Sequence, residues 1–318
     1  MKFTLPQSPA WPGKVAIVSL SGAVQPERLQ TGVARLRALG CTVDAGAHVA
    51  RQWRYFAGTD DERLAAFNEV LAGDSDIVFF SRGGYGVSRL LHRIDWARVA
   101  ASGKVFCGFS DITAFSLAAL ARAHYVTFAG PLAAAEFAQT DDLVARDFSE
   151  TQLTGLLTSA KSGYSYPDCV SDVAHEAATI NGTLWGTNLA LVAHLVGTPY
   201  MPGIDGGILV LEDIGEEPYA IERMFWQLKH AGILDRQSAI ILGAFTDCKP
   251  GANLRYAYDM PEAIETLREI APCPVLTGFP FGHVPAKVTL PMGAPATIKI
   301  DGPRYSLLVQ DFLDGTGA

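Results

Sequence analysis

The chain lacks a long apolar stretch, and it has no excess of basic side chains. No run of about 18 apolar residues occurs in its sequence, so we expect no membrane-spanning helix. Lysine and arginine together number 25, against 33 aspartate and glutamate residues, and the formal net charge is −8. Proteins that bind phosphate backbones need clustered lysine and arginine. We therefore predict neither a membrane nor a nucleic acid as a partner.

Paired cysteines and metal-binding clusters are also missing. The cysteines number five and no two form a C-x-x-C pair, which argues against a disulfide framework and against a thiolate zinc site. No histidine, cysteine and aspartate side chains have the spacing of metal ligands, so we predict no metal and no other cofactor. Residues 1–6 contain no apolar signal-peptide core. Unpaired cysteines fit a reducing compartment, and we expect a cytoplasmic protein.

The first half of the chain alternates apolar strand-like runs with helical patterns. Strands are predicted at residues 14–20, 41–45, 76–80 and 105–109, and helices at residues 26–39, 60–72, 86–92 and 111–123. Such alternation predicts an α/β fold with a doubly wound, mainly parallel sheet, of the flavodoxin-like or amidotransferase-like kind. We assign this N-terminal α/β domain to residues 1–150.

The pattern loosens after this domain and then changes. Serine, threonine, glycine and tyrosine dominate residues 148–174, and Pro167 would break a helix, so we predict a linker at residues 151–175. Residues 176–318 are predicted to form a mixed α/β domain. Its strands are expected at 178–184, 207–211 and 238–245, its helices at 188–196 and 220–230, and an antiparallel β element at 287–290, 296–300 and 305–309.

One serine directly follows a predicted strand and precedes a predicted helix. Ser110 stands in the segment Gly-Phe-Ser-Asp at residues 108–111. At such a turn the hydroxyl is exposed at the carboxyl edge of the sheet, and the N–H of Asp111 points from a helix N-terminus toward a developing oxyanion. The structural alternative is that Ser110 only caps the helix. Ile112 also stands where a full G-x-S-x-G elbow has its second glycine, so both interpretations stay open.

A second loop is rich in glycine. Residues 81–86 read Ser-Arg-Gly-Gly-Tyr-Gly and directly follow the apolar run at 76–80. Glycine lets the backbone approach a ligand closely, and N–H groups here could complete an oxyanion hole or hold a carboxylate. Arg82 is a natural partner for a substrate carboxylate. The alternative is a tight strand-to-helix turn without a ligand.

A histidine and a glutamate stand at positions that often carry function. His283 ends the segment Gly-Phe-Pro-Phe-Gly-His at residues 278–283, a loop stiffened by proline and glycine. Glu212 ends the apolar run at 207–211, where a carboxylate could accept the Nδ1–H of a histidine and hold its tautomer. The alternatives are a surface-loop histidine and a solvated acid at a strand end.

Seven segments together resemble the LD-carboxypeptidases, a serine peptidase family that trims murein peptides. They occur in the family's order and cover most of the chain. The matching residues are 55–60 with Arg63, 82–86, 108–113, 197–200, 211–213, 221–224 and 278–283.

The resemblance implies a catalytic triad in the chain order Ser, Glu, His. It makes Ser110 the nucleophile, Glu212 the residue that orients the base, and His283 the base, with Gly84 and Asp111 supplying backbone N–H groups to the oxyanion hole. The implied reaction releases the terminal D-alanine from murein tetrapeptide, next to meso-diaminopimelate, in peptidoglycan recycling. The resemblance also suggests a homodimer.

Substrate contacts and two other functions remain open. Arg82, Tyr85, Arg223 and Trp185 are candidates for substrate binding, the arginines because a guanidinium can grip a terminal carboxylate with two hydrogen bonds. Arg223 could instead pair with a nearby glutamate. A microcin-immunity peptidase shares this fold and triad but cleaves aminoacyl-nucleotide toxins, and it would need aromatic side chains for base stacking. A peptide-binding protein without catalysis is the alternative from another class.

Overall fold

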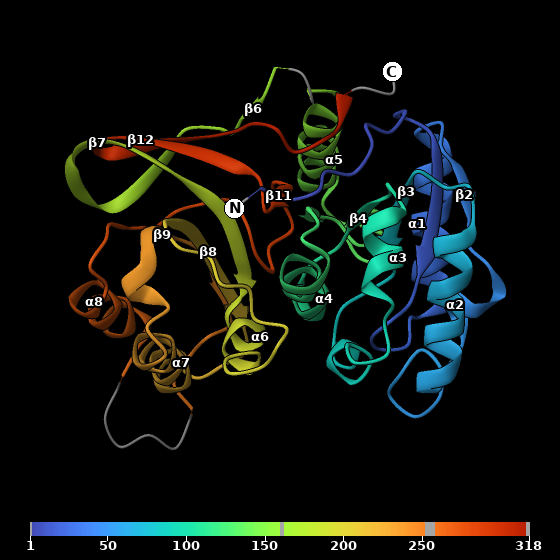
Figure 1. Cartoon of the computed structure of the whole chain (residues 1–318), viewed down its shortest axis with the longest axis horizontal. Helices are drawn as coiled ribbons and strands as arrows, with labels where there is room; N and C mark the ends of the chain where they lie inside the picture. The colour runs from blue at the N-terminus through green and yellow to red at the C-terminus, as the bar shows by residue number, and fades with distance from the viewer. Residues whose placement is uncertain (1, 160–161, 252–257, 316–318) are drawn as a thin grey trace.

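The protein consists of two lobes that each hold one sheet, as the cartoon of the computed structural model shows (Figure 1). The structure describes residues 2–159, 162–251 and 258–315. Both sheets have six strands. The first lobe is built mostly from the N-terminal half of the chain and the second from the C-terminal half.

The sheet of the first lobe has the strand order β11-β5-β4-β3-β1-β2. Its first five strands in the sequence are parallel, in the order 2-1-3-4-5 of flavodoxin-like sheets. Their bounds are β1 (Lys14–Val18), β2 (Thr42–Asp44), β3 (Ile77–Phe80), β4 (Val105–Cys107) and β5 (Thr127–Ala129). The predicted doubly wound α/β fold is therefore confirmed.

Helices accompany this sheet and follow from local signals. They are α1 (Pro26–Ala38), α2 (Asp60–Ala72), α3 (Trp96–Ala101), α4 (Thr113–Ala118) and α5 (Leu143–Thr158). Helix α2 has the bounds that the sequence predicts, because Thr59 and Glu62 form a reciprocal capping box at its start. The predicted helix at 111–123 is divided instead into a 3₁₀ turn at Ser110–Ile112, α4 and a π-helical turn at Ala119–Ala123.

The second lobe has the strand order β10-β9-β8-β7-β12-β6. Strands β7 to β10 are parallel, whereas β12 pairs antiparallel with β7 and with β6. The predicted mixed α/β lobe with an antiparallel element is confirmed. The bounds are β6 (Tyr164–Ser165), β7 (Cys169–Asn188), β8 (Gly207–Ile214), β9 (Gln237–Thr246), β10 (Val275–Leu276), β12 (Pro295–Val309), α6 (Leu189–His194), α7 (Pro218–His230) and α8 (Met260–Ile270).

Much of the predicted linker has regular structure, which corrects the expectation of a loose connector. Helix α5 continues to Thr158 because Asp142 caps its N-terminus and Leu153 and Leu156 are buried. Strand β7 begins at Cys169, nine residues before the predicted strand. Residues 160–161 of the predicted linker lie outside the described residues. The domain limits at 150 and 176 remain a prediction.

Helix α4, which follows Ser110, lies between the two lobes near the centre of the molecule (Figure 1). It packs against β5 of its own lobe and against β7 and α6 of the other. Strand β11 (Leu290–Met292) comes from the C-terminal half, yet it pairs antiparallel with β5. These contacts bring the carboxyl ends of β3 and β4 close to the second lobe.

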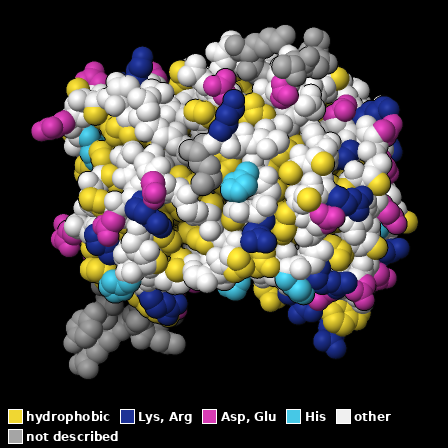
Figure 2. Space-filling model, in the orientation of Figure 1, with side chains coloured by type: hydrophobic (Ala, Val, Ile, Leu, Met, Phe, Trp, Pro, Cys, Tyr) yellow, Lys and Arg dark blue, Asp and Glu magenta, His cyan; other side chains and the backbone are white. Residues whose placement is uncertain are grey.

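The surface carries both signs of charge. On the face drawn in Figure 2, acidic and basic side chains are interspersed around the molecule. None of the helices in the described ranges is both long and apolar enough to cross a bilayer.

Candidate active site

Ser110 sits at a strained turn directly after strand β4. Its φ angle is 64°, in the left-handed region that residues with a side chain seldom adopt. Such a backbone costs on the order of 1–3 kcal/mol and recurs at functional sites. The turn lifts the hydroxyl off the sheet edge, as in nucleophile elbows. The hydroxyl can therefore be reached from a cavity between the lobes.

Ser110, His283 and Glu212 form a continuous chain of hydrogen bonds. The distance between His283 Nε2 and Ser110 Oγ is 3.0 Å, and that between His283 Nδ1 and Glu212 Oε2 is 2.7 Å. The Glu212 side chain is 0% exposed, and its Oε1 has no hydrogen-bond partner among the described residues. A buried carboxylate that contacts only the imidazole favours the tautomer with a proton on Nδ1, which leaves Nε2 free to accept the serine proton.

A threonine hydroxyl and a neighbouring glycine fix the position of His283. Its carbonyl accepts a hydrogen bond of 2.9 Å from the hydroxyl of Thr246, the last residue of β9. Gly282 has a φ angle of 124°, and a Cβ there would lie 3.2 Å from Glu212 Oε2. Only glycine combines this conformation with this close approach to the carboxylate. The loop thus holds the imidazole against the acid.

The glycine loop after β3 borders the serine. A Cβ added to Gly83 would lie 2.7 Å from Ser110 Cβ, and the Gly83 carbonyl accepts a hydrogen bond from the N–H of Gly22. In a trans peptide the next N–H, that of Gly84, points the opposite way. Within the described part of the chain, no acceptor is bonded to the N–H of Gly84 or to that of Asp111. Both donors are free for a ligand oxygen.

The Asp111 carboxyl ties the serine turn to its surroundings. Its Oδ2 accepts a hydrogen bond of 2.6 Å from the Ser21 hydroxyl and one of 3.0 Å from the Val87 N–H, just beyond the glycine loop. Burial raises the pKa of Asp111 above its ordinary value, although these two hydrogen bonds oppose the shift. This carboxyl joins the loops after β1, β3 and β4.

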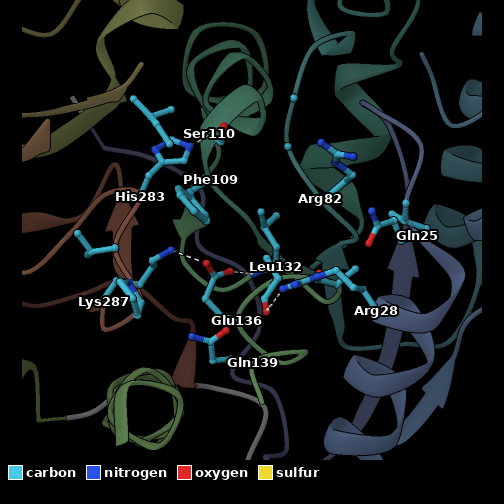
Figure 3. A pocket seen from close by; sticks show the side chains of 18 residues that line it. Gln25, Arg28, Arg82, Phe109, Ser110, Leu132, Glu136, Gln139, His283 and Lys287 are labelled. Carbon is cyan, nitrogen blue, oxygen red and sulfur yellow. Dashed lines mark hydrogen bonds and ion pairs between the residues drawn. The ribbon is translucent and has the colours of Figure 1, made fainter. Parts of the chain in front are cut away.

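A pocket of about 750 Å³ opens beside the serine (Figure 3). Its charged side chains are Arg28, Arg82, Lys287 and Glu136. Lys287 is buried and forms an ion pair with Glu136, while its Nζ lies 3.8 Å from the centre of the Phe109 ring. The lining residues are Val24, Gln25, Arg28, Arg82, Gly83, Gly84, Phe109, Ser110, Leu132, Ala134, Ala135, Glu136, Gln139, Ile214, His283, Val284, Pro285 and Lys287.

Three of the four predicted substrate contacts do not line this pocket. Trp185 is 1% exposed and donates its indole N–H to Gln237, so it is a core residue. Arg223 lies on the exposed side of α7. Tyr85 is 51% exposed and packs against Phe56 instead. Arg82 does line the pocket, as do Ser110, His283 and Gly84.

Sequence reasoning missed the other charged residues of the pocket. Arg28, Glu136 and Lys287 belong to no motif, and each lies far from the others in the sequence. The ion pair of Lys287 with Glu136 joins residues that are 151 positions apart. A weak signal existed only for Arg28, since the first turn of a helix disfavours a basic side chain.

The described residues contain no cluster of three or more histidine, cysteine, aspartate or glutamate side chains that could hold a metal ion. Separately, the hydrogen-bonded arrangement of Ser110, His283 and Glu212 is suited to acyl transfer. A hydroxyl bonded to a histidine can attack a carbonyl, and free N–H groups beside it can stabilise the resulting oxyanion.

Two family models match the two halves of the chain. The LD-carboxypeptidase N-terminal domain matches residues 15–130, and the LD-carboxypeptidase C-terminal domain matches residues 181–298. A crystal structure of muramoyltetrapeptide carboxypeptidase from Oxalobacter formigenes superposes with a TM-score of 0.85 at 37% identity, over 95% of this chain and 100% of that one.

Two curated relatives extend the comparison. The murein tetrapeptide carboxypeptidase of Pseudomonas aeruginosa is 30% identical over 294 residues, which are 90% of this chain and 93% of the relative. The microcin C7 self-immunity protein of Escherichia coli is 28% identical over 309 residues, covering 89% and 88%. With both of its domains matched and its fold shared, the chain belongs to the LD-carboxypeptidase family.

Proposed function

We propose that the protein is a serine-type LD-carboxypeptidase that releases the terminal D-alanine of murein tetrapeptide by cutting the bond after meso-diaminopimelate. The observation that carries the proposal is the chain of hydrogen bonds from Ser110 through His283 to Glu212, at 3.0 and 2.7 Å. Relatives that are named for murein and muramoyl peptides support the substrate.

The proposed reaction proceeds through an acyl-enzyme. His283 Nε2 takes the proton of Ser110 as Oγ attacks the carbonyl carbon at the L-centre of diaminopimelate. The N–H groups of Gly84 and Asp111 stabilise the oxyanion. The C–N bond breaks, and the proton on Nε2 passes to the amine of D-alanine as it leaves. Water, activated by the same imidazole, then attacks the ester and regenerates the serine.

Charge in the pocket supports an exopeptidase. The substrate of a carboxypeptidase ends in a carboxylate, and Arg82 lines the same pocket as Ser110. One of its Nη1 hydrogens is donated to the Ala23 carbonyl at 2.8 Å, which fixes the guanidinium without neutralising it. We propose that Arg82 binds the terminal carboxylate.

A second candidate function is hydrolysis of aminoacyl-nucleotide toxins. Similarity to the microcin C7 self-immunity protein favours it. A nucleobase needs an exposed aromatic surface for stacking. The described residues that line the pocket include one aromatic side chain, Phe109, which is buried beneath Lys287. The murein peptide is therefore the better supported substrate.

Incubation with purified murein tetrapeptide tests the proposal. We expect release of D-alanine and a tripeptide product, both measurable by mass spectrometry without added metal. In the Ser110→Ala variant, kcat should fall by about 10⁶, as for other serine triads. Aspartyl sulfamoyl adenosine, a ligand in a solved microcin-immunity structure, serves as the competing substrate. Unchanged activity in Ser110→Ala, or cleavage of the nucleotide alone, would refute the murein proposal.

The resemblance to the family also suggests a setting for the reaction. We propose that the protein acts in the cytoplasm, in peptidoglycan recycling, and as a homodimer. Light scattering after size-exclusion chromatography measures the mass in solution, and a single species at the 34.0 kDa of one chain would contradict the dimer.

A further inference from the structure

The pocket contains more positive charge than a single carboxylate requires. Arg28, Arg82 and Lys287 line it together with one acidic residue, Glu136. Lys287 and Glu136 neutralise each other in an ion pair. Within the described ranges, no carboxylate pairs with Arg28 or with Arg82. The pocket of this acidic protein thus keeps two uncompensated guanidinium groups.

Arg28 is held in place by main-chain oxygens alone. Its Nε donates to the Ala134 carbonyl at 3.0 Å, and its Nη2 donates to the Ala135 carbonyl at 3.3 Å. These carbonyls belong to residues that line the pocket. Nη1 is bonded to no acceptor in the described part of the chain, so the outer edge of the guanidinium remains available. An orientation fixed in advance lowers the entropy that binding costs.

The position of Arg28 in its helix is unfavourable for the helix itself. It lies in the first turn of α1, two residues after Pro26. The helix dipole favours acidic side chains there, and a basic one adds to the positive potential at that end. Neither an ion pair nor helix stability accounts for this arginine. A ligand anion in the pocket would give this guanidinium the charge partner that it lacks.

Figure 3 shows how the charges are distributed around the cavity. Arg82, Gln25 and Arg28 lie on one side of the view, across from His283 and Lys287. Ser110 and Arg28 line the same cavity. A substrate held at Ser110 therefore occupies the cavity that Arg28 also lines.

We infer that Arg28 is a specificity-determining residue that binds a second substrate carboxylate, the one on the side chain of the residue whose carbonyl Ser110 attacks. This inference rests on the proposed function, in which Arg82 holds the terminal carboxylate. Arg28 would select a third residue whose side chain carries a carboxylate as well as an amine, such as meso-diaminopimelate. Lysine at the same position would present only an ammonium group, which the guanidinium repels.

The test compares three tetrapeptides that differ only at the third residue. They carry meso-diaminopimelate, its side-chain carboxamide, or L-lysine. For the wild type we expect kcat/KM to be about 10- to 100-fold higher with the free carboxylate than with the carboxamide, since a charge-assisted pair has that strength. Arg28→Gln should abolish this preference, mainly through KM, and Arg28→Lys should keep part of it.

Matched variants isolate the effect. Arg37→Gln removes an exposed arginine from the last turn of the same helix and should leave the preference unchanged. Arg82→Gln should lower kcat/KM for all three peptides by a similar factor. A preference that survives Arg28→Gln overturns the inference.

Binding to a Ser110→Ala protein separates this inference from the proposed function. Calorimetry then measures the affinity for each peptide without cleavage. If the affinities show the Arg28-dependent preference but the wild type releases no D-alanine, the proposed function fails and the carboxylate site stands. If the wild type releases D-alanine but the peptides with the free carboxylate and with the carboxamide bind equally tightly, the inference alone fails. If none of the three peptides binds, both the proposed function and the carboxylate site at Arg28 are refuted.

Discussion

At the scale of single residues, the orientation of the imidazole depends on Glu212. This carboxylate is completely buried and contacts His283 through one oxygen only. In Glu212→Gln the charge that stabilises the imidazolium is lost, and the amide can present its NH₂ group and reverse the tautomer. We expect kcat for D-alanine release to fall about 10⁴-fold, as in the corresponding aspartate-to-asparagine change of a serine protease, with little change in KM.

Thermal unfolding provides the control for Glu212→Gln. A buried charge with an unpaired oxygen is costly, so a neutral side chain of the same size should leave the melting temperature unchanged or raise it. A variant that loses activity and also unfolds several degrees earlier would mean that Glu212 serves mainly to stabilise the fold.

The sequence predicts Ser110, Glu212 and His283 as site candidates because each occupies a place with local signals. The serine follows an apolar strand, the glutamate ends one, and the histidine lies in a loop stiffened by proline and glycine. Arg28 gives only the weak signal of a basic residue in a helix's first turn, since its contacts are carbonyls more than 100 positions away. Trp185 is misjudged for the same reason, because its burial depends on distant strands.

At the scale of elements, the close approach of the glycine loop to the serine turn can be tested at Gly83. Its Cβ would lie 2.7 Å from Ser110 Cβ and 2.8 Å from the hydroxyl, so Gly83→Ala must displace one of the two loops. We expect kcat/KM to drop by about 100-fold or more, since loss of an oxyanion donor has that effect. Enzyme kinetics with murein tetrapeptide measure it.

Gly203→Ala is the matched control for Gly83→Ala. Apart from its chain neighbours, no heavy atom of the described residues lies within 4 Å of a Cβ added at Gly203. That variant should keep full activity. If Gly83→Ala is equally active, the loop does not contribute to the oxyanion site in the proposed way.

Asp213, at the end of β8, makes stability depend on pH. Burial and the neighbouring charge of Glu212 raise the pKa of Asp213 to about 6. Between the ordinary value of 3.8 and about 6, the folded state binds a proton that the unfolded state has released. The free energy of unfolding therefore falls as pH rises through this window, by on the order of 3 kcal/mol, and then levels off.

Denaturant unfolding at pH 4, 5, 6 and 7 measures this contribution. The difference between the wild type and Asp213→Asn isolates the site, because asparagine does not titrate. We expect the free energy of unfolding of the wild type to fall relative to that of the variant from pH 4 to 6. Above pH 6 the difference between the two should stay constant. If the wild type instead gains stability relative to Asp213→Asn as pH rises from 4 to 6, the hydrogen bonds to Asp213 lower its pKa more than burial raises it.

Elements differ in how well the sequence predicts them. Helix α2 is predicted with its true bounds because a capping box and a buried face coincide. The first half of β7 escapes prediction because its exposed positions make it resemble a polar loop, and its pairing with β12 is a long-range contact that no local pattern shows. Helix α8 is missed although it has a capping box at Asp259 and Glu262.

At the scale of the whole molecule, the fold class follows from the alternation of strands and helices, but the assembly of the lobes does not. Strand β11 returns from the C-terminal half to extend the first sheet beside β5. Nothing in its three residues indicates a partner more than 150 positions away. Long-range pairing of this kind is set by the packed molecule rather than by local propensity.

A buried pair of hydroxyls joins the lobes next to the site. Thr113 Oγ1 at the start of α4 lies 2.5 Å from Thr187 Oγ1 near the end of β7, and it also accepts a hydrogen bond from the Asn188 N–H. Both threonines are 1% exposed. Thr113 follows Ser110 by three residues, and Asn188 is paired in register with Glu212. The contact therefore connects the helix that follows Ser110 to the strand beside Glu212.

A double-mutant cycle measures the strength of this connection. Thr113→Val leaves the buried Thr187 hydroxyl without its partner, and Thr187→Val leaves the Thr113 hydroxyl with the Asn188 N–H alone. Each loss should cost about 1–3 kcal/mol of unfolding free energy. The double variant replaces both hydroxyls with methyl groups and should be less destabilised than the sum of the two. Because the lobes would meet less firmly, the single variants should also lower kcat for D-alanine release. Strict additivity of the two effects on stability would show that the hydroxyls do not interact, and that other contacts hold Ser110 within reach of His283.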